Sequence, residues 1–240
     1  MRVFSLTFLV FILSCFSSMG QAKLDERNAD LAKELPKPTD IKVLDEYYDQ
    51  DGSFVRKIQY NQGHMRVTEL IIKPKPKDRA VVPMKMVRLD TINKDSVYLV
   101  VNKSAYKVDV YYKKFKIRTY AAVFGPRPME NKCVEGDRCT PEGWFKIKAK
   151  NSASKYNKFM LLDYPNDSSV VRFNKLKQQK SIPGEARMGG NVGIHGTWKG
   201  AEDLIELGVG WTDGCVAIKN KDVDELFSIV NVGTRVRIVR

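Results

Sequence analysis

Cysteine and histidine are scarce in this 240-residue chain, which holds four cysteines and two histidines. Four cysteines are too few for a scaffold held together mainly by disulfides, and the sequence shows no cluster of metal ligands. No apolar run approaches the roughly 20 residues of a membrane-spanning helix. There is also no internal repeat. These absences exclude a disulfide-dense peptide, a metal site with a recognisable motif, and a repeat protein.

Basic and apolar residues are plentiful instead. The chain carries 41 Lys and Arg against 28 Asp and Glu, a net charge of +13, and 43% of its residues are hydrophobic. This apolar content supports a sizeable core and excludes wholesale disorder. The charge favours an anionic partner, which is nucleic acid, a membrane surface or an acidic polymer. Residues 95–240 hold 25 basic and 16 acidic side chains, so most of the excess lies there.

Residues 1–22 have the pattern of a secretory signal peptide. Arg2 precedes an apolar stretch at 4–13, and small residues lead to a cleavage site at Gly20-Gln21-Ala22. The alternative is a lipid anchor at Cys15, because Ile12-Leu13-Ser14-Cys15 is similar to a lipoprotein box, although its leucine is atypical. In both cases we expect export to the periplasm or cell envelope, which argues against a nucleic-acid partner.

The remaining chain divides into three expected parts. A polar tether is expected at 23–40 and a small N-terminal β appendage with a linker at 41–94, where Asp51-Gly52 and Gln62-Gly63 signal turns. From residue 95 the Val- and Tyr-rich runs predict consecutive strands. The domain at 95–240 is therefore expected to be mostly β, a β-rich α+β fold with few helices.

Shorter patterns refine this expectation. We expect strands at Trp144–Ala149 and 235–239, and the end of a strand at Gly193-Ile194-His195. The polar stretch 166–190 is expected to be a long loop. One helix is expected near the C-terminus, with Asn220 as its N-cap and Gly233 beyond its end. Its apolar face would consist of Val223, Leu226, Phe227 and Val230.

Three cysteines remain after signal removal. Cys133 and Cys139 flank a short glycine-containing loop, so we expect a disulfide between them in an oxidising compartment, with two unpaired thiols as the alternative. Cys215 is left over and follows Gly214 in a turn, and His195 stands 20 residues earlier. A nucleophilic thiol needs such a base, and a preceding glycine lets backbone N–H groups reach an oxyanion. A buried structural cysteine is the alternative.

Four motifs extend this pattern. They are a Val- and Tyr-rich hairpin at 97–112, Thr140-Pro141-Glu142-Gly143-x-Phe145-x-Ile147, Ile194-His195-Gly196, and Thr212-Asp213-Gly214-Cys215-Val216. In this combination and order, residues 95–240 resemble the L,D-transpeptidase family, whose catalytic domain is of the YkuD type. The resemblance implies a YkuD-like β-sandwich or barrel-like domain.

The resemblance also implies roles. Cys215 would be the nucleophile and His195 its general base and acid, with the ring oriented by the backbone carbonyl of Gly196. The N–H groups of Gly214 and Cys215 would form the oxyanion hole. The family attacks the amide after the third residue of a peptidoglycan stem peptide, and it needs no metal or cofactor.

Two positions depart from the family pattern. Asp213 stands where a second histidine is usual, and we expect it to turn outward, to bond within the turn, or to bind a substrate ammonium. Ala217 replaces an arginine implicated in substrate contact. Recognition of the substrate carboxylate would then come from Arg172, Arg187, Lys199 or Lys219, which the sequence does not distinguish.

Other residues near the motifs carry weaker expectations. Substrate binding is assigned to Trp198, Trp211, Thr212 and Asp213, with core packing as the alternative for the two tryptophans, whereas Trp144 is expected in the core. His64 is expected at a surface turn. The basic run 113–118 is interpreted as a patch for an acidic polymer or as a solvated strand edge.

Together these observations predict an exported cysteine L,D-transpeptidase acting on peptidoglycan, without cofactor and as a monomer. An L,D-carboxypeptidase or wall-peptide hydrolase using the same site is the first alternative. A non-catalytic peptidoglycan-binding module is the second. The net positive charge would then retain the enzyme at an acidic wall.

Overall fold

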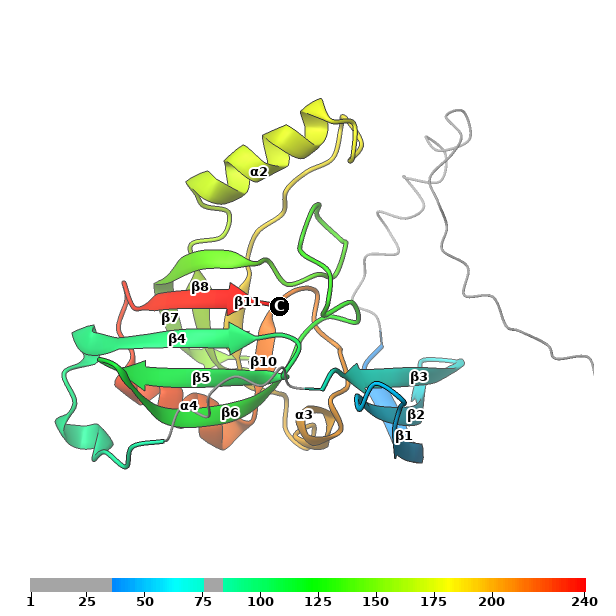
Figure 1. The fold of residues 1–240 in the computed structure, drawn as a ribbon, viewed down its shortest axis with the longest axis horizontal. Coiled ribbons are helices and arrows are strands. Elements are labelled where there is room, and N and C mark those ends of the chain that lie inside the picture. Colours follow the sequence, from blue (N-terminus) through cyan, green and yellow to red (C-terminus); the bar gives the residue numbers. More distant parts are fainter. Residues whose placement is uncertain (1–35, 76–83) are drawn as a thin grey trace, which may run out of the picture. The chain divides into compact units, whose positions relative to one another are not determined.

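The computed structural model describes residues 36–75 and 84–240 (Figure 1). The expected signal peptide, the anchor site Cys15, most of the tether and part of the linker lie outside these residues. Residues 37–240 form one compact unit. This unit contains a three-stranded sheet and a closed eight-stranded barrel, so the prediction of a mostly β fold is confirmed.

The N-terminal sheet is an antiparallel meander of β1 (Pro38–Tyr48), β2 (Phe54–Gln62) and β3 (Met65–Lys73). Its first strand begins inside the range expected to be tether. Ile58, Tyr60 and Ile71 belong to the same buried cluster as the barrel interior. Arg56 donates from Nη1 to the carbonyl of Leu207 at 2.9 Å. The sheet therefore shares its core with the barrel.

The barrel runs in the order β10-β6-β5-β4-β11-β7-β8-β9 and closes on itself. The pairs β4–β11 and β9–β10 are parallel, and the other neighbouring strands of the barrel pair antiparallel. The strands are β4 (Val97–Asn102), β5 (Lys107–Tyr112), β6 (Phe115–Val123), β7 (Gly143–Ser154), β8 (Asn157–Leu162), β9 (Gly193–His195), β10 (Val216–Ile218) and β11 (Arg235–Val239). The expected hairpin and the expected strands at 144–149, 193–195 and 235–239 are all present.

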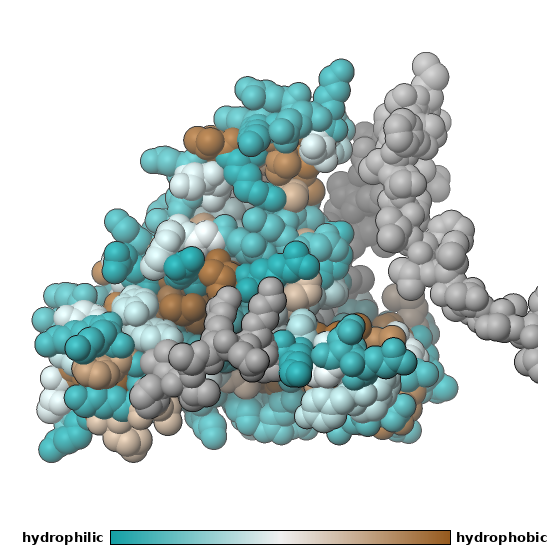
Figure 2. Space-filling view, viewed as in Figure 1, coloured by the Kyte–Doolittle hydropathy of each residue, from teal (hydrophilic) through white to brown (hydrophobic). Residues whose placement is uncertain are grey.

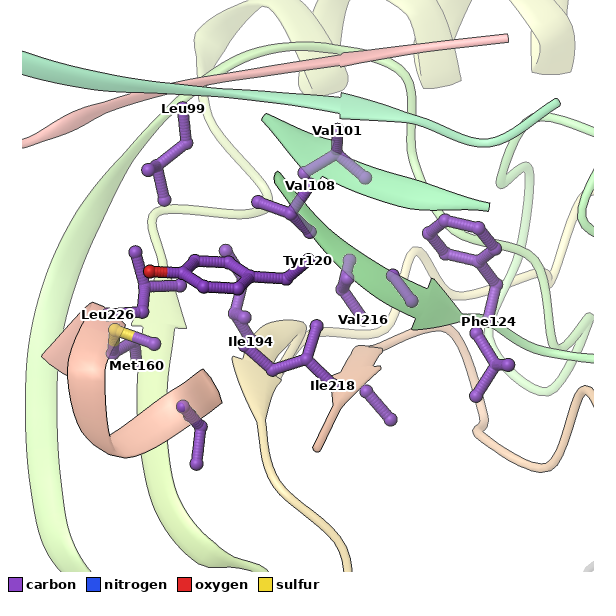
Figure 3. Packing of buried hydrophobic residues seen from close by; sticks show 14 of the residues in the cluster. Leu99, Val101, Val108, Tyr120, Phe124, Met160, Ile194, Val216, Ile218 and Leu226 are labelled. Carbon is purple, nitrogen blue, oxygen red and sulfur yellow. The ribbon is translucent and has the colours of Figure 1, made fainter. Parts of the chain in front are cut away.

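Alternation along the strands fills the barrel. On β4, Val97, Leu99 and Val101 are buried, whereas Tyr98 and Val100 are half-buried on the other face. Inward side chains from several strands meet those of the C-terminal helix, as Figure 3 shows for Leu99, Tyr120 and Leu226. Most of the buried apolar residues of the described chain thus form one continuous core.

The stretch 166–190 contains a helix, so the prediction of a long loop there is wrong. Helix α2 (Asp167–Gln178) begins after Asn166, whose side-chain oxygen accepts a hydrogen bond from the Ser169 N–H at 3.1 Å. Phe173 is the helix's one buried residue. Because almost the whole surface of α2 is solvated, its sequence lacks the apolar stripe that identifies most helices.

The C-terminal helix is present, but its start differs from the expectation. Helix α4 (Asn220–Ile229) has Lys219 as its N-cap residue, with no side-chain cap. Asn220 instead turns its Oδ1 to the N–H of Thr197 at 2.9 Å, and its own N–H donates to Glu202 at 2.6 Å. Glu202 precedes the short helix α3 (Asp203–Leu207). Asn220 therefore ties α4 to the segment after His195 instead of capping it.

Hydrophilic residues dominate the visible face of the molecule, with separate apolar patches (Figure 2). His64 is exposed in the β2–β3 turn, as expected. In the basic run, Lys116 faces Asp109 at 3.8 Å and Arg118 pairs with Glu225 at 2.9 Å. Strand β6 has neighbours on both sides, so the run is not a strand edge.

No helix among the described residues is long and apolar enough to cross a membrane.

Two short 3₁₀ turns, at Leu89–Thr91 and Lys94–Ser96, lead into the barrel.

A buried lysine, Lys103, lies directly after strand β4. Lys103 is completely buried, and its Nζ donates to the carbonyls of Glu130 and Thr140 at 2.6 and 3.1 Å. The same ammonium pairs with Glu142 at 2.8 Å. It therefore fastens both ends of the 130–142 segment to β4.

We predict that Lys103→Met lowers the free energy of unfolding by about 3–5 kcal/mol, because it leaves a carboxylate and two carbonyls without their cation. Lys107→Met is the matched control, since Lys107 is half-buried and pairs with Asp109 at 3.1 Å. It is expected to cost less, about 1–2 kcal/mol, because Asp109 keeps the Thr119 hydroxyl at 2.6 Å and Lys116 at 3.8 Å. Urea unfolding measures both, and equal losses would contradict the role assigned to Lys103.

Candidate active site

The short parallel pair of β9 and β10 brings the two candidate catalytic residues together. Ile194 pairs with Val216 and His195 with Ala217. Cys215 directly precedes β10, so it lies beside the start of β9. Parallel strands need a long connection between them, so residues 20 positions apart in sequence can lie on two neighbouring strands.

The His195 ring is almost completely buried, at 2% exposure. Its Nδ1 lies 2.7 Å from the carbonyl oxygen of Gly196, so Nδ1 carries the proton and Nε2 keeps its lone pair. Tyr156 stacks on the ring with centroids 4.8 Å apart, and Trp211 meets it edge-on at 5.5 Å. Burial lowers the pKa of His195 to about 4, so the ring is neutral at pH 7.

Gly196 has no room for a side chain. A Cβ there would lie 2.8 Å from the carbonyl oxygen of Tyr156 and would also strike Oδ1 of Asn220. The Gly196 N–H donates to the Tyr156 carbonyl at 3.0 Å. The carbonyl that orients His195 is therefore held by the β7–β8 turn and by the first turn of α4.

Cys215 is half-buried, and burial raises the pKa of its thiol to about 11. Its Sγ is directed at the carbonyl of Asn191, 3.5 Å away. Within the described chain no hydrogen bond joins this sulfur to the His195 ring. At neutral pH the site therefore holds a neutral thiol beside a neutral imidazole, and the thiol must rotate before it transfers its proton.

The turn before the thiol is built by Thr212 and Gly214. Thr212 is 3% exposed; its hydroxyl donates to the Cys215 carbonyl at 2.7 Å and accepts from the Gly214 N–H at 3.3 Å. These two bonds shape the turn, and the expected role of Thr212 in substrate binding stays a prediction. Gly214 has φ +124°, and a Cβ there would lie 2.6 Å from the Cys139 carbonyl oxygen.

Asp213 points outward, which is one of the three arrangements expected for it. Its side chain is 80% exposed and its Oδ1 accepts from Nε of Arg138 at 3.0 Å. Arg138 also reaches the carbonyl of Trp211 at 3.5 Å. The carboxylate is thus partly neutralised away from the thiol. Sequence reasoning missed Arg138, which carries no motif and lies 75 residues from its partner.

The predicted disulfide between Cys133 and Cys139 is absent, and both residues are free thiols. Their sulfurs turn apart, Cys133 to the Asn131 carbonyl and Cys139 to the Asp137 carbonyl, each at 3.3 Å. The loop is closed by the carboxylate of Asp137 instead of a covalent bond.

Asp137 accepts hydrogen bonds from the N–H groups of Cys133, Val134 and Cys139 at 2.6, 2.9 and 3.0 Å. The ammonium of Lys132 adds a contact at 2.9 Å. Burial opposes the charge, but these N–H groups and the ammonium hold the pKa of Asp137 below its usual value. The loop is therefore organised by a satisfied buried carboxylate.

The tryptophans occupy different places. Trp198 and Trp211 meet edge-on at 4.9 Å, and both pack against the core while remaining partly exposed. The Trp211 Nε1 is buried with no partner among the described residues. Trp144 is 50% exposed on β7, so its expected place in the core is wrong. Position 144 alternates with the buried Phe145 and therefore faces outward.

The four candidates for carboxylate recognition also separate. Arg172, on α2, borders a cavity with Lys132 and Tyr164, and its Nη1 donates to the Lys132 carbonyl at 2.6 Å. Lys219 is paired with Glu206, while Lys199 lines an open cleft. Arg187 contributes a backbone contact to Glu135. Ala217 is fully buried. Arg172 is therefore the candidate best placed beside the 131–139 loop.

A thiol behind a glycine turn and a neutral imidazole on the adjoining strand make a cysteine–histidine site of the kind used in nucleophilic catalysis. In the described residues there is no group of three potential metal ligands. Residues 96–238 match the model of YkuD, the L,D-transpeptidase catalytic domain. Because this match covers more than half of the chain, the protein belongs to the L,D-transpeptidase catalytic-domain family.

Several solved structures are similar. The L,D-transpeptidase from Mycobacterium smegmatis is 12% identical, with a TM-score of 0.38 over 90% of this chain and 86% of its own. Bd1075 from Bdellovibrio bacteriovorus is 18% identical, with a TM-score of 0.42 over 60% of this chain and 48% of its own. The chain thus spans about half the length of Bd1075. The Ldtfm–avibactam carbamoyl enzyme is 20% identical, with a TM-score of 0.39 over 60% of this chain and 49% of its own. No curated protein sequence matches significantly.

We predict that Gly214→Ala lowers the rate of acylation of Cys215 by roughly 100-fold or more, because the new Cβ would displace the turn from the Cys139 carbonyl. Gly233→Ala is the control: its φ is also positive, at +92°, but a Cβ there meets nothing within 4 Å. Acylation by a thioester-forming substrate analogue is followed by intact-mass spectrometry, with thermal unfolding measured on both variants. Equal rates in the two variants would show that the close approach has no part in the site.

Proposed function

We propose that this protein is an exported cysteine L,D-transpeptidase that acts on peptidoglycan stem peptides. The observation that carries the proposal is the hydrogen bond from His195 Nδ1 to the Gly196 carbonyl, with Cys215 on the adjoining strand. This bond leaves Nε2 as the only ring atom able to accept the thiol proton. The signal-like residues 1–22 support export to the periplasm or cell envelope.

The first half-reaction forms a thioester. The Cys215 thiol rotates from the Asn191 carbonyl toward the ring, and Nε2 of His195 takes its proton. The thiolate attacks the carbonyl carbon of the third stem residue, and negative charge develops on the oxygen of that carbonyl. N–H groups of Gly214 and Cys215 stabilise it once the Gly214 N–H leaves Thr212. Collapse breaks the C–N bond, and the imidazolium protonates the departing amine of D-alanine.

The second half-reaction transfers the acyl group. An acceptor amine attacks the thioester carbonyl, His195 removes a proton from that amine, and the C–S bond breaks to restore the thiol. With the amine of another stem peptide the product is a 3–3 cross-link. With water it is a free tripeptide, which is the hydrolytic alternative.

The neutral pair suits this sequence of steps. Neither group is ionised in the resting site, since burial raises the pKa of Cys215 to about 11 and lowers that of His195 to about 4. When a bound substrate excludes water from the site, the proton passes directly between the side chains of Cys215 and His195. The aromatic rings of Trp211 and Tyr156 cover part of the His195 imidazole and shield it from water.

The test is muropeptide analysis after incubation with disaccharide tetrapeptides. We predict 3–3 cross-linked dimers and released D-alanine with the wild type, and a loss of roughly 1000-fold or more with Cys215→Ala. Cys133→Ala is the matched control, because it removes another partly buried thiol of the same region, and it is expected to retain activity. Tripeptide alone, with acceptor in excess, would assign hydrolysis, and product from Cys215→Ala would refute the nucleophile.

A further inference from the structure

Four consecutive strands of the barrel, β5, β4, β11 and β7, lie side by side (Figure 1). Their outward positions carry a row of aromatic and basic side chains. In the register of the sheet, Tyr111 pairs with Tyr98, and Tyr98 pairs with Arg235. Two residues along, Arg237 pairs with Trp144. We call this set, Tyr98, Tyr111, Trp144, Arg235 and Arg237, the aromatic–arginine face.

The side chains of this face are ordered against one another. The rings of Tyr98 and Tyr111 stack with centroids 5.0 Å apart and planes 10° from parallel. The guanidinium carbons of Arg235 and Arg237 lie 5.6 and 5.3 Å from the centroid of Trp144. Trp144 remains 50% exposed. The arginines are thus held beside an open indole by cation–π contacts.

The positive charge of this face is not compensated. Within the described part of the chain Arg235 and Arg237 form no ion pair, although they are two residues apart on one strand face. Asp109 lies on the same face of the sheet but already contacts Lys107 at 3.1 Å and Lys116 at 3.8 Å. Two exposed like charges on one strand face raise the local positive potential, which attracts an anion.

A groove continues the face beyond Tyr98. It is lined by Tyr98, Lys113, Asn231, Thr234 and Arg235, among others. The acid in this groove, Asp95, accepts a hydrogen bond from Asn231 at 3.4 Å. Four neighbouring strands span roughly 14 Å, about the length of three linked sugar rings. The face and groove together thus form an elongated surface with flat apolar rings, guanidinium groups and amide and hydroxyl donors.

This surface is distant from the catalytic strands in the barrel. The strand order places the outer strands of the face, β5 and β7, two steps from β10 and β9, and its inner strands, β4 and β11, three steps away. A ligand on the face is therefore separated from Cys215 and His195 by at least two strand spacings, roughly 10 Å. It would hold the enzyme on its polymer while the catalytic site works on a stem peptide.

We propose that the aromatic–arginine face binds the glycan backbone of peptidoglycan, with sugar rings packed on Trp144 and the tyrosines and stem carboxylates bound by the two arginines. Flat aromatic rings fit the C–H faces of sugars, and a guanidinium binds a carboxylate through two parallel hydrogen bonds. The identity of this polymer rests on the proposed function; the chemistry of an acidic glycan rests on the face alone.

The test is cosedimentation with purified sacculi in the Cys215→Ala background, so that turnover does not alter the polymer. We expect Arg235→Gln/Arg237→Gln to weaken binding about tenfold or more, and Trp144→Ala about fivefold. The matched controls are Lys57→Gln/Arg66→Gln, which removes two exposed charges of the N-terminal sheet, and Tyr48→Ala, which removes a 74% exposed ring. Both are expected to bind like the parent.

Binding of Arg235→Gln/Arg237→Gln equal to that of Lys57→Gln/Arg66→Gln would overturn the proposal. Soluble glycan fragments carrying stem peptides should compete, and polyglutamate of equal charge should not; equal competition would make the face a general polyanion site and refute the glycan. With Cys215 restored, both double variants should form thioester at the wild-type rate. If the wild type forms no thioester yet the binding differences persist, the proposed function fails and the glycan face stands.

Discussion

The hydrogen bond from His195 Nδ1 to the Gly196 carbonyl is the interaction on which the site depends. It fixes one tautomer and one ring orientation, and it does so inside a nearly closed aromatic enclosure. The carbonyl is itself fixed, because Gly196 is packed so closely against Tyr156 and Asn220 that no side chain fits. Strand β9, the β7–β8 turn and helix α4 therefore converge on one peptide group. The barrel can be understood as the scaffold that holds this peptide beside the turn of Cys215.

The other half of the site is held from the opposite direction. Lys103 anchors the 130–142 segment to β4, and Asp137 collects three backbone N–H groups within that segment. The segment then presents the Cys139 carbonyl to Gly214, and Arg138 pairs with Asp213. A buried ammonium and a buried carboxylate, each satisfied, thus support the turn that carries the thiol. The carboxylate of Asp213, which adjoins the proposed oxyanion hole, faces solvent and Arg138.

Much of the fold could be predicted from the sequence, because alternation of buried and solvated residues is a local signal. The hairpin of β4 and β5, strand β11 and the apolar face of α4 all follow from it. The pair Cys215 and His195 was found through glycine-rich motifs. Contacts between distant segments could not be predicted, such as those of Arg138 with Asp213 and of Asn220 with Thr197. The polar helix α2 was missed for a local reason, because its sequence lacks an apolar stripe. The disulfide was predicted wrongly because spacing indicates that two thiols are near each other, and it does not reveal that Asp137 already closes the loop.

The central claim is that His195 is a neutral base with its proton on Nδ1. Nitrogen-15 NMR of the imidazole side chains measures this directly, and the chain has only two histidines, so exposed His64 serves as an internal reference. We predict that His195 remains neutral and Nδ1-protonated from pH 8 down to pH 5.5, with a pKa of about 4. An imidazolium at pH 6 to 7, or a proton on Nε2, would contradict it, because the thiol would then face a charged partner or a ring without a free lone pair.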